Sequence, residues 1–212
     1  RDYAREKDVL DMGRAHAERA GIDPDLAEEV LRKLIHSSLA SQERERVIAE
    51  GRGDGQRALV IGGAGKMGAW FVDFFASQGF DTVVADRGVD DGPARFRNWT
   101  DAGVDYDVIV VAAPLAVSGR ILEQLPVLKP AGLVFDIGSL KSPLIDGLLE
   151  LRDAGCRVTS LHPMFGPETR LLSGRHLIFC DAGVPEATAA AQELFGSTMV
   201  EQIEMGLDDH DR

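Results

Sequence analysis

The sequence has 212 residues, of which 44% are hydrophobic and 27% are charged. This composition is typical of a folded globular protein and excludes a mainly disordered or collagen-like chain. Lys and Arg total 23 against 35 Asp and Glu, and the formal charge of −12 argues against a nucleic-acid partner, whose phosphates it would repel. No apolar run approaches the ~20 residues that span a bilayer, so we expect no membrane segment.

The first fifty residues have a helical pattern. We predict one helix over residues 8–20, ended by Gly21, and a second that starts at Asp23-Pro24 and extends to about residue 50. Each helix has one apolar stripe, so the pair needs a further surface to pack against. A glycine-rich linker over residues 51–56 separates this helical segment, residues 1–50, from a second domain over residues 57–212.

From residue 57 onward, short apolar runs alternate with helical stretches. We predict strands at residues 58–61, 82–85, 108–112, 133–136, 157–161, 176–180 and 199–203. We predict helices at residues 67–78, 118–125, 143–153 and 185–195, and a short helix in the variable stretch after the second strand. Continuous apolar strands are typical of a parallel sheet covered by helices on both faces. The sequence therefore predicts an α/β fold with a doubly wound, mostly parallel sheet.

A glycine motif follows the first strand. Gly63, Gly65 and Gly68 match G-x-G-x-x-G, with Lys66 and Met67 inside the motif. In the Rossmann type of doubly wound fold the first glycine allows a tight turn, the second admits a pyrophosphate, and the third lets helix and strand pack closely. The helix N-terminus then offers N–H groups to the phosphates. The motif predicts a dinucleotide site, and a glycine-rich turn without a ligand is the alternative.

Two further residues fit such a site. Asp86 ends the second strand, where a carboxylate accepts hydrogen bonds from the adenosine ribose and repels a 2′-phosphate, so we expect NAD in preference to NADP. Arg87 follows directly and can weaken that preference. Pro114 lies where the chain turns over the dinucleotide. As an alternative, Asp86 only caps a surface turn.

Polar residues also follow later strands, at the edge where open α/β sheets bind ligands. Asp136-Ile-Gly-Ser139-Leu-Lys141 follows one strand, and Leu161-His162-Pro-Met-Phe-Gly-Pro167 contains the end of the next. A neutral histidine accepts a proton at neutral pH, as the oxidation of an alcohol requires. Ser139 is placed to hydrogen-bond the same hydroxyl, and Lys141 to offer positive charge to an acid. A strand-end histidine is equally often a structural hydrogen-bonding group.

These segments, together with Asp209-His-Asp-Arg212, resemble prephenate dehydrogenase of the bifunctional T-protein type. The resemblance covers residues 57–212 and implies an enzyme that oxidises the small molecule prephenate with NAD to 4-hydroxyphenylpyruvate and CO2, in tyrosine biosynthesis. It implies that His162 is the catalytic base, that Ser139 holds the substrate hydroxyl and orients His162, and that His210 lies near the substrate mouth. In that family a helical dimerisation domain follows and donates an arginine to the substrate, so the resemblance implies a homodimer for the full-length proteins.

The leader resembles two of the three helices of an all-helical chorismate mutase, an isomerase. The resemblance implies that Arg5 binds the substrate, Glu6 contacts its hydroxyl, and Ser38 and Gln42 line the pocket. Residues four apart share one helix face, as such a pocket needs. A charged, solvated helix is the alternative. Because the family's long first helix is not matched here, we expect no mutase activity from this chain by itself.

Other functions stay open from the sequence. An arogenate or amino-deoxyprephenate dehydrogenase differs in how the substrate side chain is recognised, and a β-hydroxyacid dehydrogenase relies on a lysine from a helical domain. A sensor module that only binds NAD needs the glycine motif and Asp86 but has no use for Ser139 and His162 together. The two cysteines, Cys156 and Cys180, are too few for a disulfide framework or a metal knuckle, which favours a cytoplasmic protein without a metal.

Overall fold

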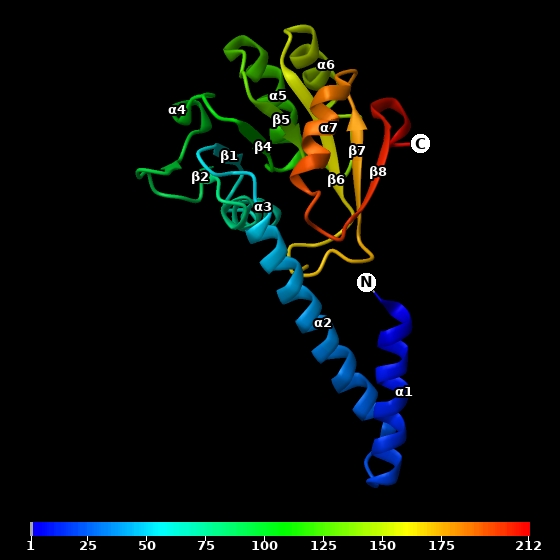
Figure 1. Ribbon diagram of the computed structural model, residues 1–212. Helices are drawn as coiled ribbons and strands as arrows, with labels where there is room; N and C mark the ends of the chain where they lie inside the picture. The colour runs from blue at the N-terminus through cyan, green and yellow to red at the C-terminus, as the bar shows by residue number, and fades with distance from the viewer. Residues whose placement is uncertain (1) are drawn as a thin grey trace.

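The computed structural model describes residues 2–212, which begin with a helical hairpin that projects from the rest of the molecule (Figure 1). Its two helices are α1 (Tyr3–Arg19) and α2 (Pro24–Ala49). Helix α1 begins five residues earlier than predicted, because the carboxylate of Asp2 accepts the N–H of Arg5 and caps the first turn. Helix α2 begins as predicted, with the side chain of Asp23 at its N-cap.

The remaining residues, 57–212, form what we call the sheet body. Its strands are β1 (Arg57–Ile61), β2 (Asp81–Ala85), β3 (Arg95–Phe96), β4 (Val108–Val111), β5 (Leu133–Asp136), β6 (Arg157–Pro163), β7 (His176–Asp181) and β8 (Glu201–Gly206). They form one sheet in the order β3-β2-β1-β4-β5-β6-β7-β8. Neighbouring strands are parallel except for β6 and β7, which are antiparallel. The predicted doubly wound, mostly parallel sheet is confirmed.

Helices cover both faces of this sheet. They are α3 (Lys66–Ser77), α4 (Trp99–Ala102), α5 (Leu115–Leu128), α6 (Ile145–Asp153) and α7 (Pro185–Leu194), with a 3-10 turn at Leu207–Asp209. Strand residues alternate between two cores. Leu59 and Ile61 pack with the cluster that holds α5 and α6, whereas Ala58 and Val60 pack with the phenylalanines of α3. Because both faces are buried, the strands are continuous apolar runs.

The structure differs from the predicted elements at several ends. Strand β6 is two residues longer than predicted, so His162 lies within the strand instead of after it. Strand β8 begins two residues later than predicted; its exposed edge position removes the apolar pattern that would mark it. The two-residue β3 was not predicted. Helix α5 begins directly after Pro114, three residues earlier than predicted, and continues through Pro126 to three residues beyond the predicted end.

The second half of α2 is anchored to the sheet body. Glu43 is buried, and its carboxylate accepts the backbone N–H groups of Leu172 and Met199. Arg46 donates to the carbonyl of Ser197, and Arg44 forms an ion pair with an aspartate of α3. The hairpin is therefore attached through polar contacts that the apolar pattern does not reveal. Among residues 2–212, no helix combines the length and the apolar character needed to cross a bilayer.

Candidate active site

Five neighbouring strands, β1, β2, β4, β5 and β6, run parallel and therefore end at one edge of the sheet. The glycine motif follows β1, Asp86 follows β2 and Pro114 follows β4. Ser139 and Lys141 follow β5, and His162 lies near the end of β6. The structure thus brings the residues predicted for the dehydrogenase to the edge at which open α/β sheets bind ligands, on both sides of the point between β1 and β4 where the strand order reverses.

The loop between β1 and α3 is tightly packed. Gly62 has φ +87°, and a β-carbon there would lie 2.7 Å from the backbone of Ala112, so the turn requires glycine at this position. We expected that role for Gly63, which instead lies against the side chain of Val84. A β-carbon on Gly68 would overlap the carbonyl oxygen of Gly62, in agreement with the close packing expected of that glycine.

Helix α3 begins at this loop. Its N-cap is Gly65, which has no side chain to satisfy the first turn. The N–H groups of Lys66, Met67 and Gly68 have no carbonyl partner within the helix, and the helix dipole adds a partial positive charge. This set of donors fits the pyrophosphate of a dinucleotide.

Asp86 lies beside the same loop. One carboxylate oxygen accepts the N–H of Ala64 at 3.2 Å, and the other accepts the N–H of Gly88 at 2.8 Å. The side chain therefore joins the end of β2 to the glycine loop, at the position predicted for the ribose contact. Pro114, the N-cap of α5, follows the segment that touches Gly62.

His162 is held by a chain of hydrogen bonds. Its Nδ1 lies 2.8 Å from Nε2 of His210, and Nδ1 of His210 lies 2.7 Å from the carboxylate of Asp211. Burial, followed by the nearby charges of Lys141 and His210, lowers the pKa of His162 below its ordinary value of 6.5. The neutral imidazole, the form that accepts a proton, is thereby favoured. Among residues 2–212, no group of three or more His, Cys, Asp or Glu is arranged to hold a metal ion.

Lys141 lies fully buried beneath this histidine pair. Its ammonium donates to Asp136 at 3.0 Å and to the carbonyl of Leu161 at 2.7 Å. We predicted that Lys141 offers its positive charge to a substrate. In the structure its ammonium is instead paired with Asp136 in the interior. Ser139 is exposed on the same loop, and within the described part of the chain it makes no hydrogen bond to His162, whose Nδ1 contacts His210 instead.

The loop that follows His162 is fastened to α3. The indole N–H of Trp70 donates to the carbonyl of Thr169 at 2.9 Å, and the rings of Trp70 and Phe165 lie 5.0 Å apart between centroids. The helix that begins at the glycine loop therefore also positions the segment after the histidine. The prediction missed Trp70, since its spacing on the helix indicates only a core position.

The four residues of the mutase resemblance are also brought together. Arg5 and Glu6 of α1, with Ser38 and Gln42 of α2, line one cavity of about 690 Å³. The amide of Gln42 donates to the hydroxyl of Ser38 at 3.3 Å.

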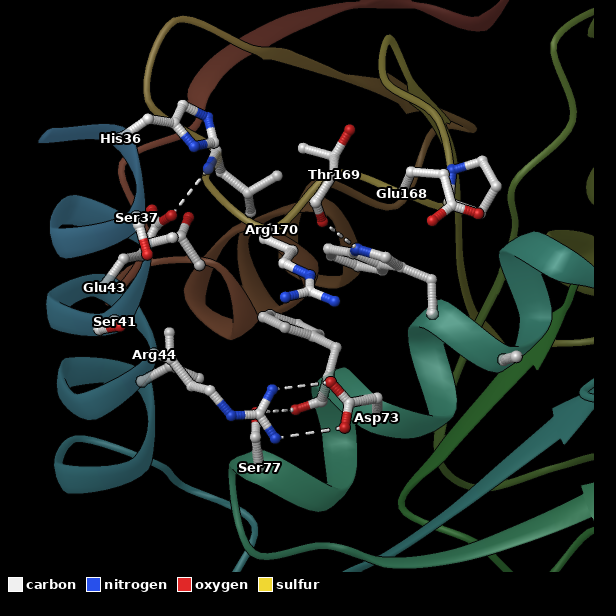
Figure 2. Close-up of a pocket in the computed structure, with 18 of the residues that line it drawn as sticks. His36, Ser37, Ser41, Glu43, Arg44, Asp73, Ser77, Glu168, Thr169 and Arg170 are labelled. Carbon is white, nitrogen blue, oxygen red and sulfur yellow. Dashed lines mark hydrogen bonds and ion pairs between the residues drawn. The ribbon is translucent and has the colours of Figure 1, made fainter. Parts of the chain in front are cut away.

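A second cavity, of about 800 Å³, lies between α2, α3 and the loop after His162. In Figure 2 the Arg44–Asp73 ion pair spans the two helices at one end of this cavity, and Arg170 extends into it from the loop.

Comparison with known proteins gives a family for this chain. The family model described as "Prephenate dehydrogenase, nucleotide-binding domain" matches residues 80–200, more than half of the chain. A T-protein from Enterobacter agglomerans is 29% identical over 183 residues, which is 86% of this chain and 47% of the relative. A T-protein from Haemophilus influenzae is 30% identical over 190 residues, covering 87% of this chain and 47% of the relative. The chain thus spans about half the length of these curated relatives.

A solved structure shares the fold. Prephenate dehydrogenase from Aquifex aeolicus, in complex with hydroxyphenyl propionate and NAD+, matches with a TM-score of 0.58 and 18% sequence identity, covering 74% of this chain and 62% of that chain. The extent of the family match and the identity to the T-proteins decide the assignment. The chain belongs to the prephenate dehydrogenase family.

Proposed function

We propose that this chain supplies the NAD-binding and base-bearing part of a prephenate dehydrogenase, which converts prephenate and NAD to 4-hydroxyphenylpyruvate, CO2 and NADH. One observation carries the proposal. His162 lies at the ligand-binding edge of the sheet, with Nδ1 engaged by His210 and with surroundings that favour the neutral ring. Its Nε2 makes no hydrogen bond within residues 2–212, so this atom is available to a substrate hydroxyl.

The chemistry requires a base at one position. As prephenate is oxidised, C4 loses a hydride and the bond between the ring and its carboxylate breaks, so that the ring becomes aromatic. NAD, when bound, accepts the hydride. Nε2 of His162 takes the proton of the C4 hydroxyl as the hydride leaves, and returns it when the electrons of the broken C–C bond complete the phenol. Ser139 holds the same hydroxyl. Such base assistance contributes about 10²–10⁴-fold.

The coenzyme preference is expected to depend on Asp86. Its carboxylate lies beside the glycine loop, where it hydrogen-bonds a ribose and repels a 2′-phosphate. In Asp86→Ala we expect the ratio of kcat/KM for NAD to that for NADP to fall about tenfold or more, as the loss of a charged hydrogen bond implies. Steady-state kinetics with both coenzymes measures this ratio. Asp90→Ala removes a neighbouring exposed carboxylate and is the control. An unchanged ratio in Asp86→Ala would rule out the ribose contact.

The pH dependence follows from the lowered pKa of His162. Burial and the charges of Lys141 and His210 disfavour the imidazolium, so the base stays neutral and active at pH values below 6.5. We expect kcat/KM for prephenate to fall only at acidic pH, with a midpoint below 6.5, when measured from pH 5 to pH 8 at saturating NAD. A midpoint at or above pH 7 would contradict the environment described for this ring.

The proposed activity is tested by NADH formation with three substrates. Prephenate, arogenate and chorismate are each supplied with NAD to this chain and to the full gene product that contains it. Turnover of prephenate supports the proposal, whereas turnover of arogenate alone would assign the alternative dehydrogenase. Binding of NAD without turnover of any of the three would instead favour a sensor module.

The chorismate arm tests a second activity. We infer that the cavity lined by Arg5, Glu6, Ser38 and Gln42 is part of a chorismate mutase site, because cation, acid, hydroxyl and amide line one space of about 690 Å³. Conversion of chorismate to prephenate would then precede NADH formation. Because no mutase activity is expected from this chain by itself, the result with the full gene product decides: oxidation of prephenate without any conversion of chorismate would remove this inference and leave the dehydrogenase in place.

A further inference from the structure

We infer that His210 and Asp211 are positioning residues that fix the tautomer of His162, so that its Nδ1 carries the proton and its Nε2 presents the lone pair. This inference rests on the proposed function, in which Nε2 of His162 is the base. Asp211 does not contact His162. It contacts His210, and through His210 it determines which nitrogen of His162 carries the proton. The geometry of the chain of hydrogen bonds carries the argument.

Asp211 is the last residue of this series of hydrogen bonds, farthest from His162. Its carboxylate accepts the backbone N–H of Lys141 at 3.0 Å, the backbone N–H of Ser142 at 2.7 Å and the Ser142 hydroxyl. These groups and His210 hold the pKa of Asp211 well below its ordinary value. An ionised carboxylate only accepts hydrogen bonds. Nδ1 of His210, at 2.7 Å, therefore carries a proton.

That proton decides the state of the next nitrogen. In the state in which both histidines are neutral, the proton on Nδ1 of His210 leaves the lone pair on Nε2, which faces Nδ1 of His162 at 2.8 Å. Nδ1 of His162 must then donate, and the neutral His162 keeps its lone pair on Nε2. The other tautomer of His210 would remove its N–H from Asp211 and would put the proton of His162 on Nε2, where it blocks the base.

Lys141 holds both ends of the hydrogen-bonded series that runs from His162 through His210 to Asp211. The ammonium of Lys141 donates to the carbonyl of Leu161, directly before His162, while the backbone N–H of Lys141 donates to Asp211. The charged and titratable groups around the His162 ring are Lys141, Asp136, His210 and Asp211. The side chain of His210 is only 6% exposed, so water does not compete for its hydrogen bonds.

We expect the loss of Asp211 to lower activity as the loss of a residue that orients a functional histidine does. Removal of the partners that orient metal-ligating histidines costs about 10–100-fold in affinity or activity, and we expect a similar effect for a partner that orients a catalytic histidine. In Asp211→Asn the amide oxygen would keep the N–H donors of Lys141 and Ser142, so the NH2 group would face Nδ1 of His210. That nitrogen would then have to accept a hydrogen bond, which reverses the tautomer of His210. We expect a fall of about 10–100-fold in kcat/KM for prephenate with an unchanged Kd for NAD.

The experiment reads the tautomer directly. The imidazole nitrogens are observed by 15N NMR in the full chain without substrate, in the wild type, in Asp211→Asn and in the control Asp209→Asn. Asp209 is an exposed carboxylate two residues away, paired with Arg212, so its substitution makes the same charge change outside the chain of hydrogen bonds. We expect protonated Nδ1 at His162 in the wild type and in Asp209→Asn, and a population protonated at Nε2 in Asp211→Asn.

A second pair of variants separates positioning from structure. In His210→Gln the side-chain carbonyl can accept the Nδ1 proton of His162, whereas His210→Ala leaves no acceptor. We expect His210→Gln to retain the Nδ1-protonated signal and most of kcat/KM, and His210→Ala to lose both. The inference is overturned if Asp211→Asn gives the same NMR signals as Asp209→Asn, or if His210→Gln is no better than His210→Ala. Because NMR needs no turnover, a wild type inactive on prephenate would remove the proposed function and still leave the tautomer measurable.

Discussion

Replacement of His162 by asparagine is expected to lower kcat/KM for prephenate by about 10²–10⁴-fold while the Kd for NAD stays within about twofold of the wild type. Asparagine cannot take up the hydroxyl proton. It does not alter the glycine loop or Asp86, which lie at the ends of β1 and β2. Steady-state kinetics, together with titration of NAD followed by fluorescence, measures the two quantities separately.

A control is available in the other histidine of the same strand pair. His176 begins β7, and its exposed Nε2 lies 2.9 Å from the carboxylate of Glu201. His176→Asn removes an imidazole from the same antiparallel ladder without touching the proposed base, so we expect wild-type kinetics. If His162→Asn lowered NAD binding as much as turnover, His162 would be a structural residue and the assignment of the base would be wrong.

Replacement of Lys141 by methionine is expected to have the largest effect on stability, lowering the free energy of unfolding by about 3–5 kcal/mol. Both partners of the Lys141–Asp136 ion pair are fully buried. Methionine would leave the carboxylate of Asp136 buried without its cation and the carbonyl of Leu161 without its donor. Urea unfolding, followed by circular dichroism, measures the difference.

Two further variants test this explanation. Lys33→Met makes the same substitution in an exposed pair with Glu29 on α2, where solvent screens the charges and we expect almost no change in the free energy of unfolding. The double variant Asp136→Asn/Lys141→Met removes both charges, and the new amide keeps an oxygen for the N–H that Gly138 donates, so this variant should recover part of the loss. A Lys141→Met protein as stable as Lys33→Met would show that the buried pair does not hold this edge together.

Much of the fold could be predicted because the dominant signal is local. A fully buried parallel strand is an apolar run whatever its neighbours, and the start of α2 at Asp23-Pro24 depends only on adjacent residues. The glycine motif is local in the same way, although the position that needs a left-handed backbone proved to be Gly62 and not Gly63. Strand β8 was misplaced because an exposed edge strand lacks the apolar pattern.

The candidate site was less predictable, because its contacts join residues far apart in sequence. His162 was identified, but its partner His210 is 48 residues away. The segment that contains Asp211 was singled out only for His210. Nothing in the local sequence indicates that the carboxylate of Asp211 accepts the backbone N–H of Lys141, which lies 70 residues earlier. Lys141 shows the same limit: a lysine beside a strand end suggested a substrate contact, whereas the sheet buries it against Asp136.

The most direct test of the account is a structure of this protein with NAD and hydroxyphenyl propionate, the ligands of the Aquifex aeolicus relative. The central claim is that Nε2 of His162 faces the reacting hydroxyl while Nδ1 stays bonded to His210. We predict a distance of about 2.6–3.2 Å between Nε2 and the phenolic oxygen, with the dinucleotide on the glycine loop. A ligand bound elsewhere, or a His162 ring turned away from the phenol, would contradict the assignment of His162 as the base.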